Sequence, residues 1–422
     1  MTRQPRITPS QVEVAAAERT RLANGIDLYT LPSDDFEVLR ISFVFRAGSA
    51  VQQVPFSASA AANLLAEGSR DMTGAEIAER LDYYGSWYDV NLDRDYAYIN
   101  FATLSKFFDR TLAVAEQILL YPTFPEEELR SYCAKRRQRL AIERTKVDVE
   151  AREAFAKALF GAGHPYGISS DEAEYDRLTR DAVVAFHTAH YTAENCFVVC
   201  SGRIGAHERQ AIAALAERIP QRAAAAPAVF PEPQTTRSVF VEHPGAVQSS
   251  LRIGRVLFPR QHPDFVGMQV VATALGGYFG SRLMQNLREE HGYTYGAVAA
   301  MVNFERTGYF AVATQVGTDV TREALREIFR EIERLGAEPL SEEELGLVRN
   351  MMIGEMMRVL DGPFGIADVT IENILCGTDN SIISENIRRI RRITPEEVRQ
   401  LARRYLRREE LVTVVAGAEK PW

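Results

Sequence analysis

The feature that most constrains the fold of this chain is an internal duplication. The segment LTRDAVVAFHTAHYTAENCFVVCSG (178–202) resembles ITPEEVRQLARRYLRREELVTVVAG (393–417), and Thr179 pairs with Thr394 at an offset of 215 positions. Both copies are typical of an N-capped helix followed by a β-branched strand that ends in glycine. A repeat of two elements in the same order predicts related structural units in the two parts of the chain.

A second pair of segments repeats at nearly the same offset. FPEEELRSYCAKRRQRL (124–140) resembles LSEEELGLVRNMMIGEM (340–356), with Leu129 and Leu345 lying 216 positions apart. Acidic residues fill the first turn of both predicted helices, where the helix dipole favours them. We therefore predict two related halves rather than one domain with chance similarity.

The segment PQRAAAAPAVFPEPQTTRS (220–238) separates the two halves. It is rich in Ala and Pro and poor in core-forming residues, which is typical of a linker. The predicted organisation has four parts, which are an N-terminal extension (1–20), an N-terminal domain (21–219), the linker (220–238) and a C-terminal domain (239–422).

Each half mixes strands and helices. IDLYTLP (26–32), VLRISFVFRAG (38–48) and DYAYINFATL (95–104) are typical of strands because of their β-branched and aromatic content. TGAEIAERLDYYG (73–85) is typical of a helix that starts with a capping box and stops at glycine. The order of these elements predicts an α+β fold in which helices cover each sheet.

Composition and charge exclude several classes of protein. The formal net charge of −8 argues against an electrostatic nucleic-acid binder. The sequence contains no run of about 18 apolar residues, so no membrane-spanning helix is predicted. The polar N-terminus lacks the apolar core of a secretory signal. Four scattered cysteines do not make a disulfide framework. We expect a cytoplasmic protein, although a chain trimmed of its signal would look the same.

Isolated chemical motifs are weak in most of the chain. His187 and His190 have a helical spacing that can bind metal, but without further ligands nearby an ordinary surface pair is the preferred interpretation. GGYFGSRL (276–283) has glycines near a helix start but lacks the ending and the spacing of nucleotide-binding loops. No G-x-S-x-G elbow supports serine hydrolase chemistry.

One segment stands apart from the rest. A helix is predicted from about Gly280 to His291, with Gly292 as its stop, Arg288 in its last turn and Tyr295 just beyond it. Arg288 can be a cation placed favourably near a helix C-terminus, and Tyr295 can be an ordinary strand aromatic. The residues alone leave open whether the two form a functional pair.

The same segment, LGGYFGSRLMQNLREEHGYTYG (275–296), resembles the second-half signature of the pitrilysin/insulinase family of zinc peptidases. PTFPEEEL (122–129), HPYG (164–167), the duplicated halves and the linker are similar to that family as well. The resemblance implies two homologous domains, each a mainly antiparallel sheet covered by helices. Together they would form one half of a clamshell that closes around an unfolded peptide.

The resemblance also assigns roles to particular residues. Family members carry an inverted zinc motif, H-x-x-E-H, in one domain, and an Arg and a Tyr seven residues apart in the facing domain. Arg288 and Tyr295 match that pair. The implied role of both is to stabilise the substrate and the transition state at a zinc site supplied by another chain.

The zinc motif itself is missing. Aligning the family's glycine after the zinc helix with Gly68 of FSASAAANLLAEG (56–68) places the two histidines at Ser59 and Asn63 and the glutamate at Ala62. Ala has no donor, and Ser and Asn are poor zinc ligands beside imidazole. The downstream glutamate ligand falls near Glu143, and a substrate-lining Asn-Ala pair is replaced by Tyr88 and Asp89.

This combination resembles the non-zinc subunit of two-chain members, such as those similar to mitochondrial processing peptidase. We expect the chain to bind no metal and to be inactive alone. Its expected partners are an H-x-x-E-H-bearing chain that holds the zinc and an unfolded peptide substrate, and a homodimer of the isolated chain is also allowed. The alternative is a non-catalytic structural or peptide-binding member of the same family.

Overall fold

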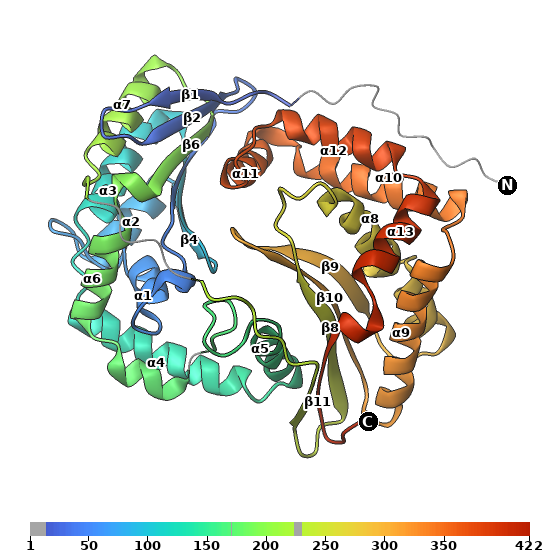
Figure 1. Ribbon diagram of the computed structural model, residues 1–422. Coiled ribbons are helices and arrows are strands. Elements are labelled where there is room, and N and C mark those ends of the chain that lie inside the picture. The colour runs from blue at the N-terminus through green and yellow to red at the C-terminus, as the bar shows by residue number, and fades with distance from the viewer. Residues whose placement is uncertain (1–13, 170, 223–229) are drawn as a thin grey trace.

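Two β-sheets, one from each half of the chain, organise the structure (Figure 1). The computed structural model describes residues 14–169, 171–222 and 230–422. The strands of the first sheet are β1 (Glu18–Arg21), β2 (Asp27–Pro32), β3 (Val38–Phe45), β4 (Trp87–Leu92), β5 (Ala97–Leu104) and β6 (Cys196–Gly202). Those of the second are β7 (Ser238–Glu242), β8 (Gln248–Leu257), β9 (Ala297–Asn303), β10 (Gly308–Gly317) and β11 (Val412–Gly417).

The two sheets have the same topology. The first has the order β1-β2-β6-β3-β5-β4 and the second the order β7-β11-β8-β10-β9, so the second repeats the first without the edge strand β1. Only β2–β6 and β7–β11 pair in parallel among the described strands, and the other pairs are antiparallel. The repeated segments of the sequence supply the corresponding strands β6 and β11. The α+β fold with mainly antiparallel sheets is therefore confirmed.

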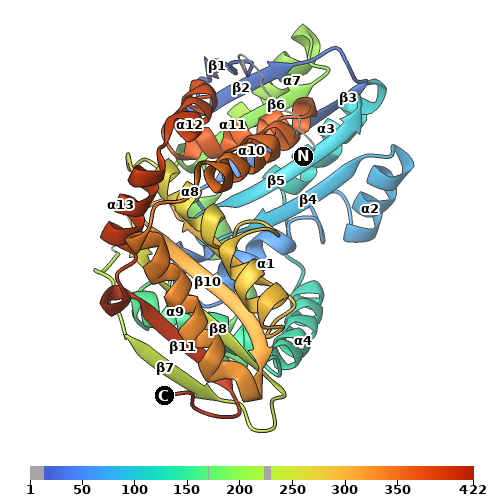
Figure 2. The same ribbon diagram turned by 90° about the vertical axis from the view of Figure 1, so that its right-hand side faces the viewer.

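Helices cover one face of each sheet. The first sheet is covered by α1 (Ser57–Asn63), α2 (Gly74–Tyr83), α3 (Phe108–Leu120), α6 (Arg180–His190) and α7 (Ala206–Glu217). The second is covered by α8 (Phe265–Gly276), α9 (Thr321–Ala337), α10 (Glu342–Val359), α12 (Ser381–Arg392) and α13 (Pro395–Tyr405). Figure 2 shows α8, α9 and α13 lying over the strands of the second sheet. Apolar residues at alternate strand positions, such as Phe43 and Phe310, are fully buried beneath these layers.

The halves exchange one helix each across the space between the sheets. After α4 (Glu126–Glu143) the chain continues into α5 (Val147–Phe160), which packs on β8 and β11 of the second sheet. In the corresponding place after α10, helix α11 (Gly362–Leu375) packs on β6 and β2 of the first sheet. Figure 1 shows both helices reaching from their own half to the other. Each sheet therefore has its second face partly covered by the opposite half.

Local signals predicted the element boundaries well where side chains set them. Thr73 and Glu76 form the capping box at the start of α2, and Gly85 ends the helix with a positive φ of 61°. The strand predicted from residue 95 begins at Ala97 instead. Asp93 Oδ1 accepts the backbone N–H groups of Asp95 and Tyr96, both at 2.7 Å, and holds them in a turn before the ladder starts.

The predicted domain boundaries at residues 20, 219 and 238 stay a prediction. Part of the predicted linker, residues 223–229, lies outside the described residues. The C-terminal part of the linker, from residue 230, is hydrogen-bonded to the end of α5. The Gln234 N–H donates to Phe160 O at 3.0 Å, and the Thr236 N–H donates to Ala158 O at 2.8 Å. Within the described ranges, no helix combines the length and apolar character needed to cross a bilayer.

His187 is embedded in the first half rather than lying on its surface. Its ring stacks on Tyr191 at 4.7 Å and meets the edge of Phe124 at 5.2 Å between ring centroids. The Nε2 atom is buried and has no hydrogen-bond partner among the described residues. Burial, followed by the positive charge of Arg222, lowers the pKa of His187 from its ordinary 6.5 to about 4.

This histidine is expected to make the first half acid-labile. Because the unfolded chain takes up the proton at higher pH than the folded one, stability is fully present above pH 6.5 and is lost as the pH falls toward about 4. The loss attributable to His187 is up to about 3 kcal/mol. His187→Phe keeps an aromatic ring and should flatten the pH dependence of the unfolding free energy in urea titrations. The exposed-site variant His207→Gln should leave it steep, and an equally steep profile for His187→Phe would refute the assignment.

Candidate functional site

Helix α1 lies at the positions where the sequence resemblance expects a zinc helix, and its polar side chains already form hydrogen bonds with the backbone and with α4. The Ser59 hydroxyl donates to Phe56 O at 3.0 Å and accepts from the Tyr132 hydroxyl at 3.2 Å. Asn63 Nδ2 donates to Ser59 O at 2.7 Å. Ala62 is fully buried, at 0% exposure. The small side chains let α1 sit close to the sheet, where Leu64 and Leu65 of the following turn are buried.

These residues do not fit a zinc ion. A zinc site needs about three protein ligands with imidazole, thiolate or carboxylate donors, and the three aligned positions of α1 offer one hydroxyl, one amide and a methyl group. No group of three or more His, Cys, Asp or Glu side chains in the described part of the chain could hold a metal ion. We therefore derive no catalytic step through a metal on this chain.

The other positions aligned with the zinc half serve local structure. Glu143, at the end of α4, accepts a hydrogen bond from Arg139 Nε at 2.8 Å, and this bond holds the pKa of its carboxyl below the usual range. On the edge strand β4, the Tyr88 ring packs 5.3 Å from Phe101. Asp89 accepts from Asn91 on the same strand.

Arg288 and Tyr295 are brought together in the second half. Arg288 lies in a π-helix, Met284–Glu290, in which the His291 N–H donates five residues back to Asn286 O at 3.1 Å. Gly292 ends the turn with a positive φ of 65°, as the sequence predicted for its stop. The Arg288 guanidinium then stands 4.8 Å from the centroid of the Tyr295 ring. Tyr295 is 89% exposed, so its hydroxyl is available to a molecule outside this chain.

Polar contacts with α9 and β10 hold the π-helix and the residues after it in place. Asn286 Nδ2 donates to carboxylate oxygens of Glu327 and Glu331 on α9, both at 3.1 Å. Thr294 Oγ1 donates to Gln315 O on β10 at 2.6 Å and ties down the residue before Tyr295. One extra residue in a helical turn re-aims side chains, and such bulges are frequent at functional sites. The pair is therefore held on both sides by rigid elements.

Phe279 joins this pair, and the sequence analysis did not single it out. Its ring is 60% exposed, and the Arg288 guanidinium lies 4.6 Å from the ring centroid. An arginine held by two aromatic rings keeps few rotamers and remains fully charged. The signal in the sequence is the second of two aromatic residues that follow a pair of glycines, in the segment GGYFGSRL (276–283).

A cavity of about 630 Å³ lies between the halves. Its walls come from α1 with the preceding loop, from α5, and from the face of β8, β9 and β10 that is turned away from their helices. Ser59 of α1 lines it, so the zinc-motif position faces this space. Three arginines also line it, which are Arg94, Arg152 and Arg252.

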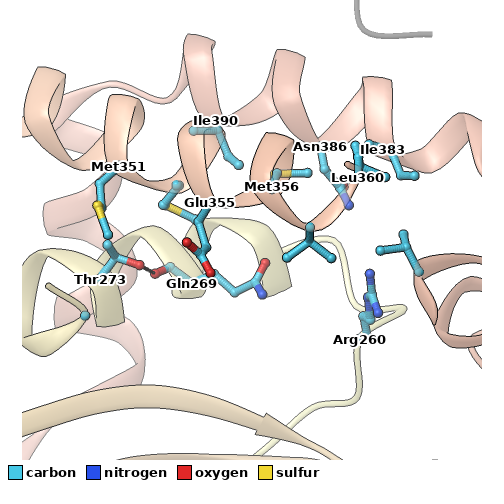
Figure 3. Close-up of a pocket in the computed structure, with 14 residues that line it drawn as sticks. Arg260, Gln269, Thr273, Met351, Glu355, Met356, Leu360, Ile383, Asn386 and Ile390 are labelled. Atoms are coloured by element: carbon cyan, nitrogen blue, oxygen red, sulfur yellow. Dashed lines mark hydrogen bonds between the residues drawn. The ribbon is translucent and has the colours of Figure 1, made fainter. Parts of the chain in front are cut away.

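A second cavity, of about 320 Å³, lies within the second half among α8, α10, α11 and α12 (Figure 3). Figure 3 shows Met351 and Met356 of α10 facing it together with Ile390 of α12. Methionine side chains adapt to irregular gaps in a core. None of the residues predicted as functional from the sequence lines this cavity.

A protein-family model matches the middle of the chain. Residues 177–352 match the model of the family described as the peptidase M16 inactive domain. That range includes Arg288 and Tyr295 and begins after α1, so it does not bear on the zinc-motif positions.

Among relatives, a zinc protease of Streptomyces coelicolor is 23% identical over 363 residues, which cover 84% of this chain and 79% of the relative. The zinc protease YmxG of Bacillus subtilis is 21% identical over 370 residues, covering 83% and 85%.

Solved structures share the fold over nearly the whole chain. A peptidase M16 inactive domain from Pseudomonas fluorescens has a TM-score of 0.87 at 21% identity and covers 96% of this chain and 98% of its own. A protease from Helicobacter pylori has a TM-score of 0.83 at 16% identity, with 96% and 100% covered. By the family model over residues 177–352, the relatives and the fold, the chain is similar to peptidase M16 proteins, in agreement with its resemblance to the pitrilysin/insulinase family.

Proposed function

We propose that this chain is the substrate-binding, catalysis-assisting subunit of a heterodimeric zinc peptidase that acts on unfolded peptides. Alone it is inactive, and its partner is a family member that carries H-x-x-E-H and holds the zinc. The observation that carries the proposal is the contact between Arg288 and the exposed Tyr295, on a chain whose α1 has no zinc ligands.

The chemistry of the pair fits peptide hydrolysis. Negative charge builds on the carbonyl oxygen of the scissile peptide as the tetrahedral intermediate forms. The Tyr295 hydroxyl can donate a hydrogen bond to that oxygen, and such fixed donors contribute about 3–4 kcal/mol to transition-state stabilisation. The Arg288 guanidinium presents parallel N–H donors that suit a substrate carbonyl or carboxylate.

The proposed dimer is cytoplasmic. The four cysteines are all free thiols, and Cys196 and Cys200 are buried in strand β6. Reduced, unpaired thiols are typical of proteins in a reducing compartment.

Reconstitution tests the proposed function directly. The chain is mixed with an H-x-x-E-H-bearing relative from the same organism, and cleavage of a quenched, unstructured peptide is followed by fluorescence. The chain alone should show no zinc-dependent cleavage, and the mixture should cleave the peptide in proportion to the heterodimer formed. A chelator of zinc should abolish the activity of the mixture. Elution of both chains in one peak in size-exclusion chromatography measures the assembly.

Two outcomes would contradict the proposal. Cleavage by the isolated chain, with one tightly bound zinc per chain in metal analysis, would mean that a metal site exists elsewhere. A heterodimer with activity no higher than that of the partner alone would favour the non-catalytic structural or peptide-binding role.

A further inference from the structure

Three arginines from different parts of the chain converge on the cavity between the halves. Arg94 comes from the turn between β4 and β5, Arg152 from α5 and Arg252 from β8. The charges of all three act on the hydroxyl of Tyr309, whose pKa burial raises and these cations hold down. The three arginines and Tyr309 therefore line the same cavity.

None of the three has a carboxylate partner among the described residues. Arg94 donates only to the backbone oxygen of Ile168, at 3.3 Å. The Arg252 Nε atom is buried and without a hydrogen-bond partner. Most other arginines of the described chain are in ion pairs, such as Arg282 with Glu344 at 2.7 Å.

The cavity wall holds one carboxylate, and it is already engaged. Glu153 lies 3.6 Å from Arg144 in an ion pair outside the arginine group. Glu153 also acts on Arg94 from a distance, as does Asp95. Two further acids interact with the group from outside the cavity wall, Asp148 with Arg252 and Glu143 with Arg152. Asp95 accepts hydrogen bonds from the Tyr166 hydroxyl and the Glu305 N–H, which occupy both of its oxygens.

Two of the three arginines, Arg94 and Arg252, are partly removed from water. Burial lowers the pKa of Arg252, and the positive charge of Arg152 lowers it further. Burial likewise lowers the pKa of Arg94. Charges removed from water are ordinarily paired, because an unpaired one forfeits its hydration. Two half-buried cations without an ion-pair partner in the described ranges, Arg94 and Arg252, and the exposed Arg152 at the same cavity are complementary to an anionic ligand.

The rest of the cavity indicates what kind of anion fits. Its volume of about 630 Å³ is far larger than one inorganic ion and is in the range of ligands of drug or short-peptide size. Phe155, Phe304 and Tyr309 give it aromatic walls, and Ala311 and Ala313 leave room over β10. The overall charge of −8 disfavours a nucleic acid. A ligand with both carboxylates and apolar groups matches these walls.

We propose that this cavity is a subsite for acidic segments of the peptide substrate, in which carboxylates bind Arg94, Arg152 and Arg252 and neighbouring apolar side chains contact the aromatic walls. This inference rests on the proposed role in peptide binding, and it adds a charge preference to it. Ser59, in the same cavity wall, places the subsite next to the helix that replaces the zinc helix.

The test measures binding by the full chain alone, so it needs neither partner nor catalysis. Three rhodamine-labelled unstructured peptides carry the same apolar residues, with three Glu, three Gln or three Lys at the variable positions. By fluorescence anisotropy the Glu peptide should bind at least about tenfold more tightly than the Gln peptide, and the Lys peptide should bind least. Arg252→Gln and Arg152→Gln should each weaken the Glu peptide about tenfold and leave the Gln peptide nearly unchanged.

Matched controls separate the subsite from general charge effects and from misfolding. Arg326→Gln removes a surface cation on α9 and should change no affinity. Arg252→Lys keeps the charge and should keep part of the preference, while thermal unfolding of each variant confirms its fold. Equal binding of the Glu and Gln peptides, or an unchanged preference in Arg252→Gln and Arg152→Gln, would overturn the subsite. Displacement of the Glu peptide by millimolar phosphate as effectively as by a tri-Glu peptide would reduce it to a site for free anions and also overturn it.

The proposed function and this subsite fail separately. If the chain does not activate a zinc-bearing partner, the binding preference measured on the isolated chain still stands. If the subsite is wrong, the Arg288 and Tyr295 assays in the reconstituted enzyme are unaffected. If both are right, Arg252→Gln in the heterodimer raises KM for the Glu peptide and leaves kcat unchanged.

Discussion

Tyr295→Phe is expected to lower kcat of the reconstituted heterodimer by about 10²–10³-fold, with a much smaller change in KM. The substitution removes one hydroxyl and keeps the ring, so the contact with Arg288 at 4.8 Å persists. A hydrogen bond made only to the developing oxyanion affects the transition state more than the bound substrate. Steady-state kinetics on an unstructured quenched peptide measures both constants.

Two companion variants sharpen this result. Tyr83→Phe changes a similarly exposed tyrosine, at 81% exposure on α2, and should leave kcat as in the wild type. Arg288→Ala should lower kcat/KM by a comparable factor, because it removes substrate contacts and also releases the Tyr295 ring. If Tyr295→Phe and Arg288→Ala both cleave as fast as the wild type, the roles given to this pair are wrong.

Phe279 is expected to act through Arg288. Its ring lies on the guanidinium at 4.6 Å and contributes no donor or acceptor of its own, so it is a positioning residue. In the heterodimer, Phe279→Tyr or Phe279→Trp should keep activity, while Phe279→Ala should lower it partly. Rescue by the aromatic variants distinguishes positioning from a merely structural role.

The duplication made the fold predictable from the sequence. Two matched segments predicted two related units, and the strands they supply, β6 and β11, take equivalent places in sheets of the same order. Local signals were reliable because one or two neighbouring side chains decide them. The Thr73–Glu76 capping box and the glycine stops at positions 85 and 292 are examples.

The candidate site was only partly predictable from the sequence. The residues that the sequence did not identify come together through contacts between distant parts of the chain. Arg252 alternates with the buried Leu251 and Ile253 along β8, a pattern that predicts a residue facing solvent. The structure instead covers that face of the sheet with α5 from the other half. The hydrophobic periodicity of a sequence does not indicate such an exchange of helices. The cavity between the halves, with its three arginines, is therefore seen only in the three-dimensional structure.

The contact between the halves can itself be tested at Tyr166, in the HPYG segment. Its hydroxyl donates to Asp95 Oδ1 at 2.7 Å, and its ring stacks on Phe304 of the second half at 4.2 Å between centroids. Asp95 Oδ2 also accepts the Glu305 N–H at 2.8 Å, so one buried carboxylate joins three segments from both halves. Burial raises the pKa of Asp95, and the bond from Tyr166 counteracts that rise.

Tyr166→Ala is therefore expected to destabilise the protein by about 3–5 kcal/mol, the usual cost of deleting a fully buried aromatic ring. Tyr166→Phe keeps the ring and loses one hydrogen bond to the buried carboxylate, so it should cost less, about 1–3 kcal/mol. Urea unfolding followed by circular dichroism measures both, with the exposed Tyr83→Ala expected to stay within about 0.5 kcal/mol of the wild type. Since Tyr166 connects the halves, its loss should also separate their unfolding into two transitions. A single transition with an unchanged midpoint in Tyr166→Ala would mean that the exchanged helices α5 and α11 hold the halves together, and not the contacts of Tyr166 with Asp95 and Phe304.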